Sequence, residues 1–127
     1  MFINNHSYFS LRYGTVAPES ILKIAQKQGI KTLALTDINN TSASLDFVRM
    51  APKYNINPVL GVDFRNNGIQ KFIILAQNNN GFQQINTYLS PIRHKYAAKT
   101  RYYLRYLNTQ GPYECYRRLC SGSLMVE

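Results

Sequence analysis

Three short apolar runs in the first half of the chain each lead directly into polar residues, and this pattern limits the folds open to the chain. The three blocks cover residues 4–10, 34–40 and 57–64. An uninterrupted apolar run such as residues 33–35 is typical of a parallel strand that is buried on both faces. In βα folds, polar residues at successive strand ends gather at one edge of the sheet and build the functional site. The pattern therefore predicts an α/β fold with a site assembled from these strand ends.

Helix and strand periodicities over residues 1–90 predict the element order βαβαββα with right-handed crossovers. We expect strands at residues 2–6, 31–36, 58–64 and 72–76. We expect helices at residues 18–27, from a cap at Thr41 or Ser42 to a bend near Pro52, and over about residues 82–89. The sequence Asn66-Asn67-Gly68 predicts a tight turn between the last two strands.

Size and charge bound the class of protein. The chain has 127 residues, which suits one small domain, and a net charge of +9, which suits contact with polyanions. Its two cysteines, Cys115 and Cys120, make no disulfide framework and have no metal-binding partners near them in sequence. No secretory signal and no run of about 18 apolar residues is visible. We therefore expect a cytoplasmic protein without membrane contact.

The last part of the chain differs from the rest, so we divide the sequence into a truncated domain at residues 1–90 and a basic Tyr/Arg-rich tail at residues 91–127. The tail holds seven Lys and Arg residues and six of the ten tyrosines, without helix or strand periodicity. Our hypothesis is that the tail is disordered or results from a shifted reading frame. The alternative is a segment that binds nucleic acid, since basic and aromatic residues together can hold phosphates and stack on bases.

Four ordered motifs carry a family resemblance. Residues 4–14 (N-N-H-S-Y-F-S-L-R-Y-G) match the pattern H-x-H-(S/T)-x-(Y/F)-S-L-x-D-G, and residues 34–40 (A-L-T-D-I-N-N) match A-L-T-D-H-x-N. Residues 56–64 match I-x-P-I-x-G-x-E-(F/V), and residues 74–85 match L-L-A-x-N-x-x-G-(Y/F)-x-x-L. With these motifs the chain resembles the PHP (polymerase and histidinol phosphatase) family. Within that family it is most similar to the N-terminal PHP domains of bacterial DNA polymerase III alpha subunits.

The resemblance implies metal ligands at five positions, where the family has His, His, Asp, His and Glu. This chain has Asn4, His6, Tyr13, Ile38 and Asp63 at those positions. Only His6 is unchanged, Asp63 is a shortened carboxylate, and an isoleucine cannot bind a metal. A catalytic zinc needs three protein ligands. We therefore expect no catalytic, cofactor-binding or metal-binding residues, with His6 and Asp63 as remnants and Asn4, Tyr13 and Ile38 as losses.

Structural roles are open to several of the same residues. His6 can form a hydrogen bond at a strand end, and Asp37 can cap the loop before the second helix. Asn39 and Asn40 are common turn residues. Gly14, like Gly61 and Gly81, can serve backbone geometry.

The resemblance implies part of a distorted βα barrel, comprising the first three to four strands with their helices, followed by the irregular basic tail. A closed barrel typically needs about 250 residues. The intact parent would be the replicative DNA-directed DNA polymerase, a nucleotidyltransferase that uses magnesium. Its partners would be the rest of the alpha subunit, the proofreading exonuclease subunit and DNA. We expect this chain alone to be an inactive supporting fragment without a cofactor. The alternatives are a small PHP-type metal-dependent phosphoesterase and a basic module that binds single-stranded nucleic acid through residues 93–118.

Overall fold

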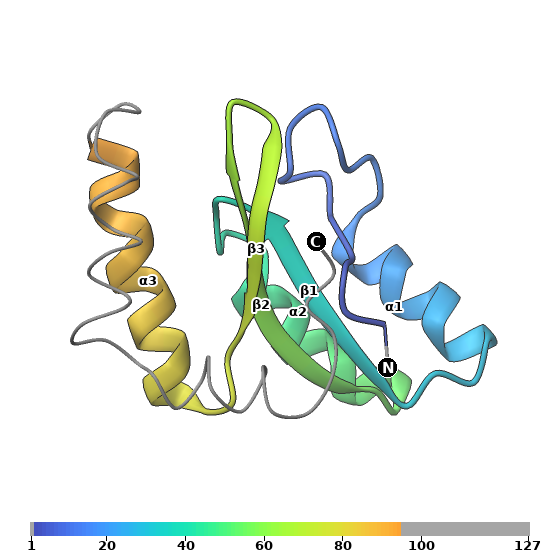
Figure 1. Ribbon diagram of the computed structural model, residues 1–127. Helices are drawn as coiled ribbons and strands as arrows, with labels where there is room; N and C mark the ends of the chain where they lie inside the picture. The colour runs from blue at the N-terminus through green and yellow to red at the C-terminus, as the bar shows by residue number, and fades with distance from the viewer. Residues whose placement is uncertain (1, 95–127) are drawn as a thin grey trace. The chain divides into compact units, whose positions relative to one another are not determined.

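The computed structural model describes residues 2–94 and confirms the mixed α/β class (Figure 1). In chain order the elements are α1 (Pro18–Lys27), β1 (Thr32–Ile38), α2 (Ser44–Met50), the 3-10 helix η1 (Ala51–Tyr54), β2 (Asn57–Asn66), β3 (Ile69–Leu75) and α3 (Asn79–His94). The chain divides into one unit that ends at Leu75 and carries the sheet, and a second unit that starts at Ala76 and contains α3. Helix α3 takes up residues 91–94 of the predicted tail, and the rest of that tail lies outside the described residues.

The sheet of the first unit has the strand order β1-β2-β3. Strands β1 and β2 are parallel, in a register that runs from Thr32 opposite Asn57 to Ile38 opposite Asp63. Strand β3 returns antiparallel to β2 through the predicted turn, where Asn67 and Gly68 have φ angles of 51° and 82°. Two successive residues with positive φ are what a tight hairpin turn with the twist of the sheet requires.

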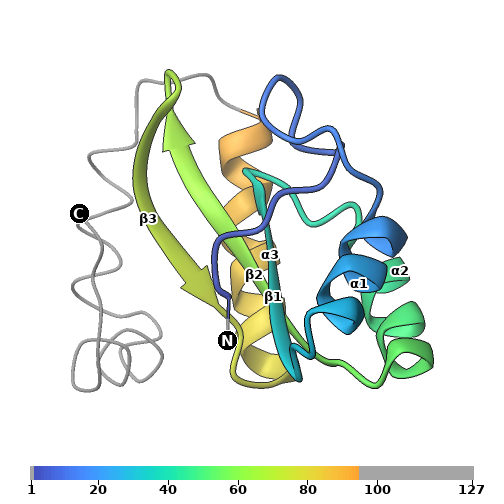
Figure 2. The ribbon, with the colours of Figure 1, turned by 90° about the vertical axis from the view of Figure 1, so that its right-hand side faces the viewer.

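Helices α1 and α2 lie on the same side of the sheet (Figure 2). They form one core with it, made of Leu22, Ala25, Leu33, Leu35, Ala43, Phe47, Ala51 and Ile56. Successive side chains of a strand point to opposite faces. Leu33 and Leu35 therefore lie on one face of β1, and Ala34 and Thr36 lie on the other. All four residues are buried. The uninterrupted apolar run thus indicated correctly that β1 is covered on both faces.

The strand predicted at residues 2–6 is wrong. The segment lies beside β1, but it makes a single parallel bridge, from Phe2 to Leu33. Backbone N–H groups of Ala34 and Thr36 donate to the carbonyl oxygens of Phe2 and Asn5 at 3.0 and 2.9 Å. The Asn5 side chain donates to the Ala34 carbonyl at 2.9 Å, and the Asn5 N–H donates to the Thr36 hydroxyl at 3.2 Å. Side chains therefore take over bonds that a regular strand makes with its backbone.

The predicted cap of the second helix is also wrong. Helix α2 starts at Ser44, after Ala43, and no side chain caps it. The Ser42 N–H instead donates to the side-chain oxygen of Asn40 at 3.1 Å, which closes a local turn before the helix. The helix ends at Met50 and continues as η1, where Pro52 lies in the first turn, as the predicted bend requires. In residues 2–94, no helix has both the length and the apolar character needed to cross a bilayer.

Candidate functional site

A buried carboxylate on β2 is the centre of the predicted site. Asp63 is fully buried, and the Nε2 atom of His6 lies 3.2 Å from its Oδ2 atom. Arg65 donates to the same oxygen through Nε at 2.9 Å and Nη2 at 2.8 Å. The other oxygen, Oδ1, is buried without a hydrogen-bond partner among the described residues. His6 and Asp63, the two residues expected as remnants of the ligand set, therefore lie together. The Arg65 guanidinium binds the same Asp63 oxygen as His6.

Arg65, which binds the Asp63 carboxylate, was missed by the sequence reasoning. The hydrogen bonds to Asp63 raise the pKa of the guanidinium above its ordinary value, and the negative charge of Asp63 adds to this against the opposing effect of burial. The signal was present in the sequence, because residues two apart in a strand point to the same face. The side chain of Arg65 is 15% exposed, so the pair lies largely away from water.

Tyr13 covers the other side of the guanidinium. The Cζ atom of Arg65 lies 4.5 Å from the centre of the Tyr13 ring, within the range of a cation–π contact. The Tyr13 hydroxyl reaches the turn between β2 and β3, where a Cβ added to Gly68 would lie 3.1 Å from it. At a position where the resemblance implies a metal-binding carboxylate, this chain therefore has a ring that packs on a cation.

The remaining two ligand positions hold no metal-binding group next to Asp63. Ile38 is the register partner of Asp63 across β1 and β2, so the structure places an apolar side chain beside the carboxylate. Asn4 is exposed and lines a neighbouring pocket. Of the five predicted positions, His6 and Ile38 each adjoin Asp63, and Tyr13 is linked to Asp63 through Arg65.

Asn39 extends the pairing of the two parallel strands beyond the end of β1. Its side-chain amide donates to the Arg65 carbonyl at 2.8 Å, and its side-chain oxygen accepts from the Arg65 N–H at 2.9 Å. The backbone N–H of Asn39 donates to the Asp63 carbonyl at 3.0 Å. Asn39 has a φ angle of 51°, so it is a turn residue as predicted, and it also fixes the backbone that carries Arg65.

The predicted capping role of Asp37 is wrong, because its carboxylate points into the first loop. Asp37 is 2% exposed and accepts three hydrogen bonds of 2.7 Å, from the Ser7 N–H, the Ser7 hydroxyl and the Ser10 hydroxyl. The Ser10 oxygen in turn accepts from the Ile38 N–H at 2.9 Å. These bonds tie the first loop to the end of β1. The two serines were missed because their partner lies about thirty residues further along the chain.

Gly14 allows the first loop to close on itself. A Cβ at this position would collide with the carbonyl oxygen of Ser7, while the Gly14 N–H donates to the Ser10 carbonyl at 2.9 Å. The predicted backbone role of Gly14 thus has a steric cause. A loop closed in this way places His6 and Tyr13, at its two ends, against β2.

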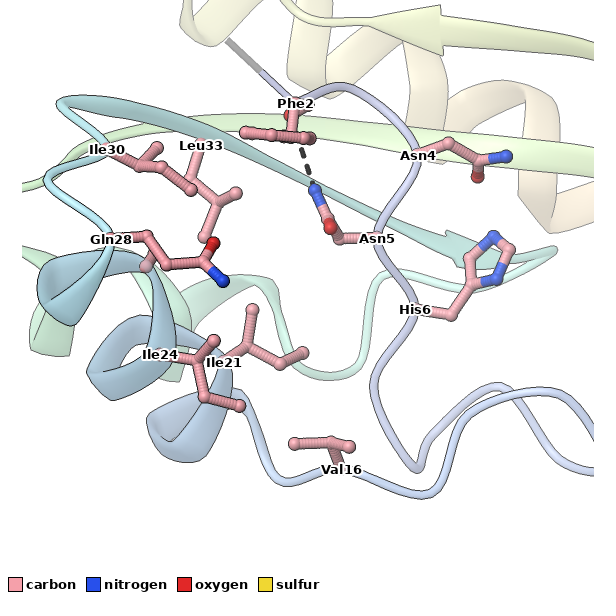
Figure 3. A pocket seen from close by; sticks show the side chains of 11 residues that line it. Phe2, Asn4, Asn5, His6, Val16, Ile21, Ile24, Gln28, Ile30 and Leu33 are labelled. Atoms are coloured by element: carbon pink, nitrogen blue, oxygen red, sulfur yellow. Dashed lines mark hydrogen bonds between the residues drawn. The ribbon is translucent and has the colours of Figure 1, made fainter.

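A pocket of about 400 Å³ lies beside the site, between the N-terminal segment and α1 (Figure 3). Its lining is mostly apolar and is made by Phe2, Asn4, Asn5, His6, Val16, Ile21, Ile24, Ala25, Gln28, Ile30 and Leu33. None of these residues is a lysine, an arginine or a carboxylate. The pocket therefore lacks the paired acid and base that general acid–base chemistry uses.

The donor set of the site can be compared with the metal cluster that the resemblance implies. In residues 2–94, no group of three or more His, Cys, Asp or Glu side chains is close enough together to hold a metal ion. His6 and Asp63 are the two donors that do meet, and Arg65 already occupies Oδ2 of Asp63. The described residues therefore do not fit the cluster.

Comparisons with known proteins agree with the sequence motifs. Residues 3–124 match the PHP domain family. The chain is 29% identical over 86 residues to DNA polymerase III subunit alpha of Buchnera aphidicola subsp. Schizaphis graminum, covering 63% of this chain and 7% of that protein. It is 30% identical over 92 residues to the same subunit of Mycoplasma genitalium, covering 68% of this chain and 10% of that protein. It is 32% identical over 81 residues to an error-prone DNA polymerase of Symbiobacterium thermophilum, covering 64% of this chain and 8% of that protein.

A solved structure supports the fold. A proposed metal-dependent phosphoesterase from Bifidobacterium adolescentis superposes with a TM-score of 0.55 at 19% sequence identity, over 73% of this chain and 33% of that protein. At this identity the likeness concerns the fold alone. The chain thus spans about a third of that structure, and between 7% and 10% of the three polymerase relatives.

Proposed function

This chain belongs to the PHP domain family, and from that membership we propose that it is the N-terminal PHP region of a DNA polymerase III alpha subunit, with a supporting role and no hydrolytic activity of its own. The similarity to named alpha subunits supports the first part of the proposal. The single observation that carries the second part is the buried Asp63 carboxylate, which is held by His6 and Arg65 where the family resemblance implies a metal.

The proposed partners follow from the same membership. The region would pack against the rest of an alpha subunit in the cytoplasm, next to the proofreading exonuclease, and would meet DNA through that assembly. The magnesium-dependent nucleotidyl transfer would belong to other parts of the polymerase, since this chain spans at most 10% of the three relatives compared above. The role assigned to this chain is therefore architectural.

The alternative function, metal-dependent phosphoester hydrolysis, needs a metal that generates the attacking hydroxide from water. Such a site has three protein ligands and one open position. Residues 2–94 bring two donors together, and a guanidinium already neutralises the carboxylate. Supporting the polymerase is thus the function that the arrangement favours. The second alternative, binding of single strands through residues 93–118, falls almost entirely outside the described residues and stays a prediction.

Hydrolysis of a phosphomonoester with added Mn²⁺ or Zn²⁺ tests the absence of activity. We expect the full chain and its His6→Ala variant to give the same background rate. A metal-dependent rate that disappears in His6→Ala would refute the absence of hydrolysis.

Co-purification tests the supporting role. The full chain is mixed with a polymerase III alpha polypeptide that lacks its own PHP region, with and without the exonuclease subunit. We expect a complex with the alpha polypeptide. Failure to bind the alpha polypeptide under any condition would count against an architectural role.

A further inference from the structure

We propose that Arg65 is a built-in counter-cation that takes the place of a metal ion in this site, so that the domain folds around its buried carboxylate without any metal. The inference concerns the same site as the proposed function and rests on it. Its test measures stability and metal response, so its outcome can be separated from those of the hydrolysis and co-purification experiments.

The burial of Asp63 creates the need for a permanent positive charge. A carboxylate that is 0% exposed is strongly destabilising unless it is paired and hydrogen-bonded. His6 is one partner, but an imidazole carries a charge only when protonated. A guanidinium stays charged at every physiological pH, so Arg65 supplies the charge that the carboxylate requires.

The contacts around the Arg65 guanidinium hold this cation in one position. Two of its nitrogens, Nε and Nη2, donate to Oδ2 of Asp63, and the Tyr13 ring covers it at 4.5 Å. The backbone of Arg65 is held on both its N–H and its carbonyl by the side chain of Asn39. Its hydrogen bonds, the packing of Tyr13 and the fixed backbone therefore all hold the Arg65 guanidinium against Asp63.

The same arrangement excludes a competing cation. A divalent ion bound through Oδ2 would have to displace two charge-assisted hydrogen bonds and would face the positive charge of the guanidinium. Ile38, the register partner of Asp63, has no side-chain atom that could bind the metal and compensate for the lost hydrogen bonds. Arg65 thus closes Oδ2 to a metal, and its charge, close to the same carboxylate, also opposes a cation at Oδ1, which is unpartnered among the described residues.

Three variants, compared with the unsubstituted chain, test the proposal by thermal unfolding of the full chain, followed by circular dichroism. Arg65→Gln leaves the buried carboxylate without its permanent charge, and we expect the Tm to fall by roughly 15 °C. Adding Asp63→Asn to Arg65→Gln removes the uncompensated charge, and we expect most of the loss to be recovered. Arg49→Gln, at an exposed position on α2, is the matched control and is expected to leave the Tm unchanged within about 2 °C.

If Arg65→Gln alone gives no folded protein, the soluble yield replaces the Tm, and the double variant is expected to restore it. A double variant no more stable than Arg65→Gln would overturn the proposal, because the cost would then not depend on the carboxylate. A rise in the Tm of the unsubstituted chain with Mn²⁺ or Zn²⁺ would overturn it as well, because it would show that the guanidinium does not close the site.

Discussion

Ser7 holds the buried carboxylate of Asp37 with two hydrogen bonds of 2.7 Å, one from its backbone N–H and one from its hydroxyl. The bonds join the first loop to the end of β1, thirty residues away in sequence. Because His6 precedes Ser7 directly, the position of the imidazole next to Asp63 depends on this link. The stability of the loop and the geometry of the site are therefore coupled.

Asp37→Asn is expected to lower the free energy of unfolding by about 3 kcal/mol. The asparagine amide lacks the negative charge that strengthens the three hydrogen bonds from Ser7 and Ser10. Its NH₂ group would also face a hydrogen-bond donor of one of these serines. Urea unfolding measures the change, with Asp46→Asn, at an exposed position on α2, as the control. Equal midpoints for the two variants would contradict the role given to Asp37.

Gly14→Ala and Gly81→Ala are expected to act in opposite directions. The first places a Cβ on the Ser7 carbonyl oxygen and should cost about 2 kcal/mol or more. At Gly81, inside α3, the nearest atom to an added Cβ lies 3.6 Å away, so alanine should stabilise the helix by about 0.5–1 kcal/mol. Chemical denaturation of both variants checks the pair, and a Gly14→Ala chain as stable as the original would refute the steric argument.

Asn39→Ala should expose the backbone of Arg65. The substitution removes both side-chain bonds to that residue, so we expect its amide proton to exchange faster and the chain to lose about 1–2 kcal/mol. Asn55→Ala is the matched control, because Asn55 has a similar φ of 55° and precedes the start of β2, whereas Arg65 lies near the end of that strand. Hydrogen exchange followed by NMR distinguishes them; the Arg65 amide should respond in Asn39→Ala alone.

The pH dependence of a surface contact has a definite sign. Lys23 and the Tyr54 hydroxyl lie 3.0 and 2.8 Å from Oε1 of Glu19, and these contacts hold the pKa of Glu19 below its ordinary value of 4.5. A carboxyl group whose pKa is lowered in the folded state stabilises the fold at pH values above its ordinary pKa. This stabilisation is lost as the pH falls through the lowered pKa. The Tm difference between the chain and Glu19→Gln should thus be small at neutral pH and vanish in acid. A difference that grows on acidification would contradict the assignment.

The features that the sequence predicted correctly are those with local causes. Helix α1 has the predicted bounds because Pro18 starts it and Gly29, with a φ of 69°, follows its end. The hairpin turn at Asn67 and Gly68 follows from the same kind of signal. Each depends on residues that are close together in the chain.

Apart from the Arg65–Asp63 pair, whose members are two positions apart in β2, the features that were missed depend on contacts between distant residues. The N-terminal segment has a strand-like sequence, but Asn5 and Thr36 replace its regular bonds with side-chain bonds across 31 positions. His6 and Asp63 are 57 positions apart, so the contact of His6 with the Asp63 oxygen that also binds Arg65 depends on how the first loop folds against β2. A pattern of residue types predicts which residues lie side by side on one face of a strand. It does not predict which of those residues a distant loop will contact.

Because the strand register sets Ile38 beside Asp63, single substitutions cannot rebuild a ligand set in this domain. A histidine at position 38 alone would adjoin a carboxylate whose positive partner, Arg65, is already in place. Replacing Arg65 alone would leave the carboxylate uncompensated, and the intermediate would fold poorly. Under the proposed role of Arg65, the two changes have to be made together, so a metal centre could be engineered at this site only through paired substitutions at positions 38 and 65.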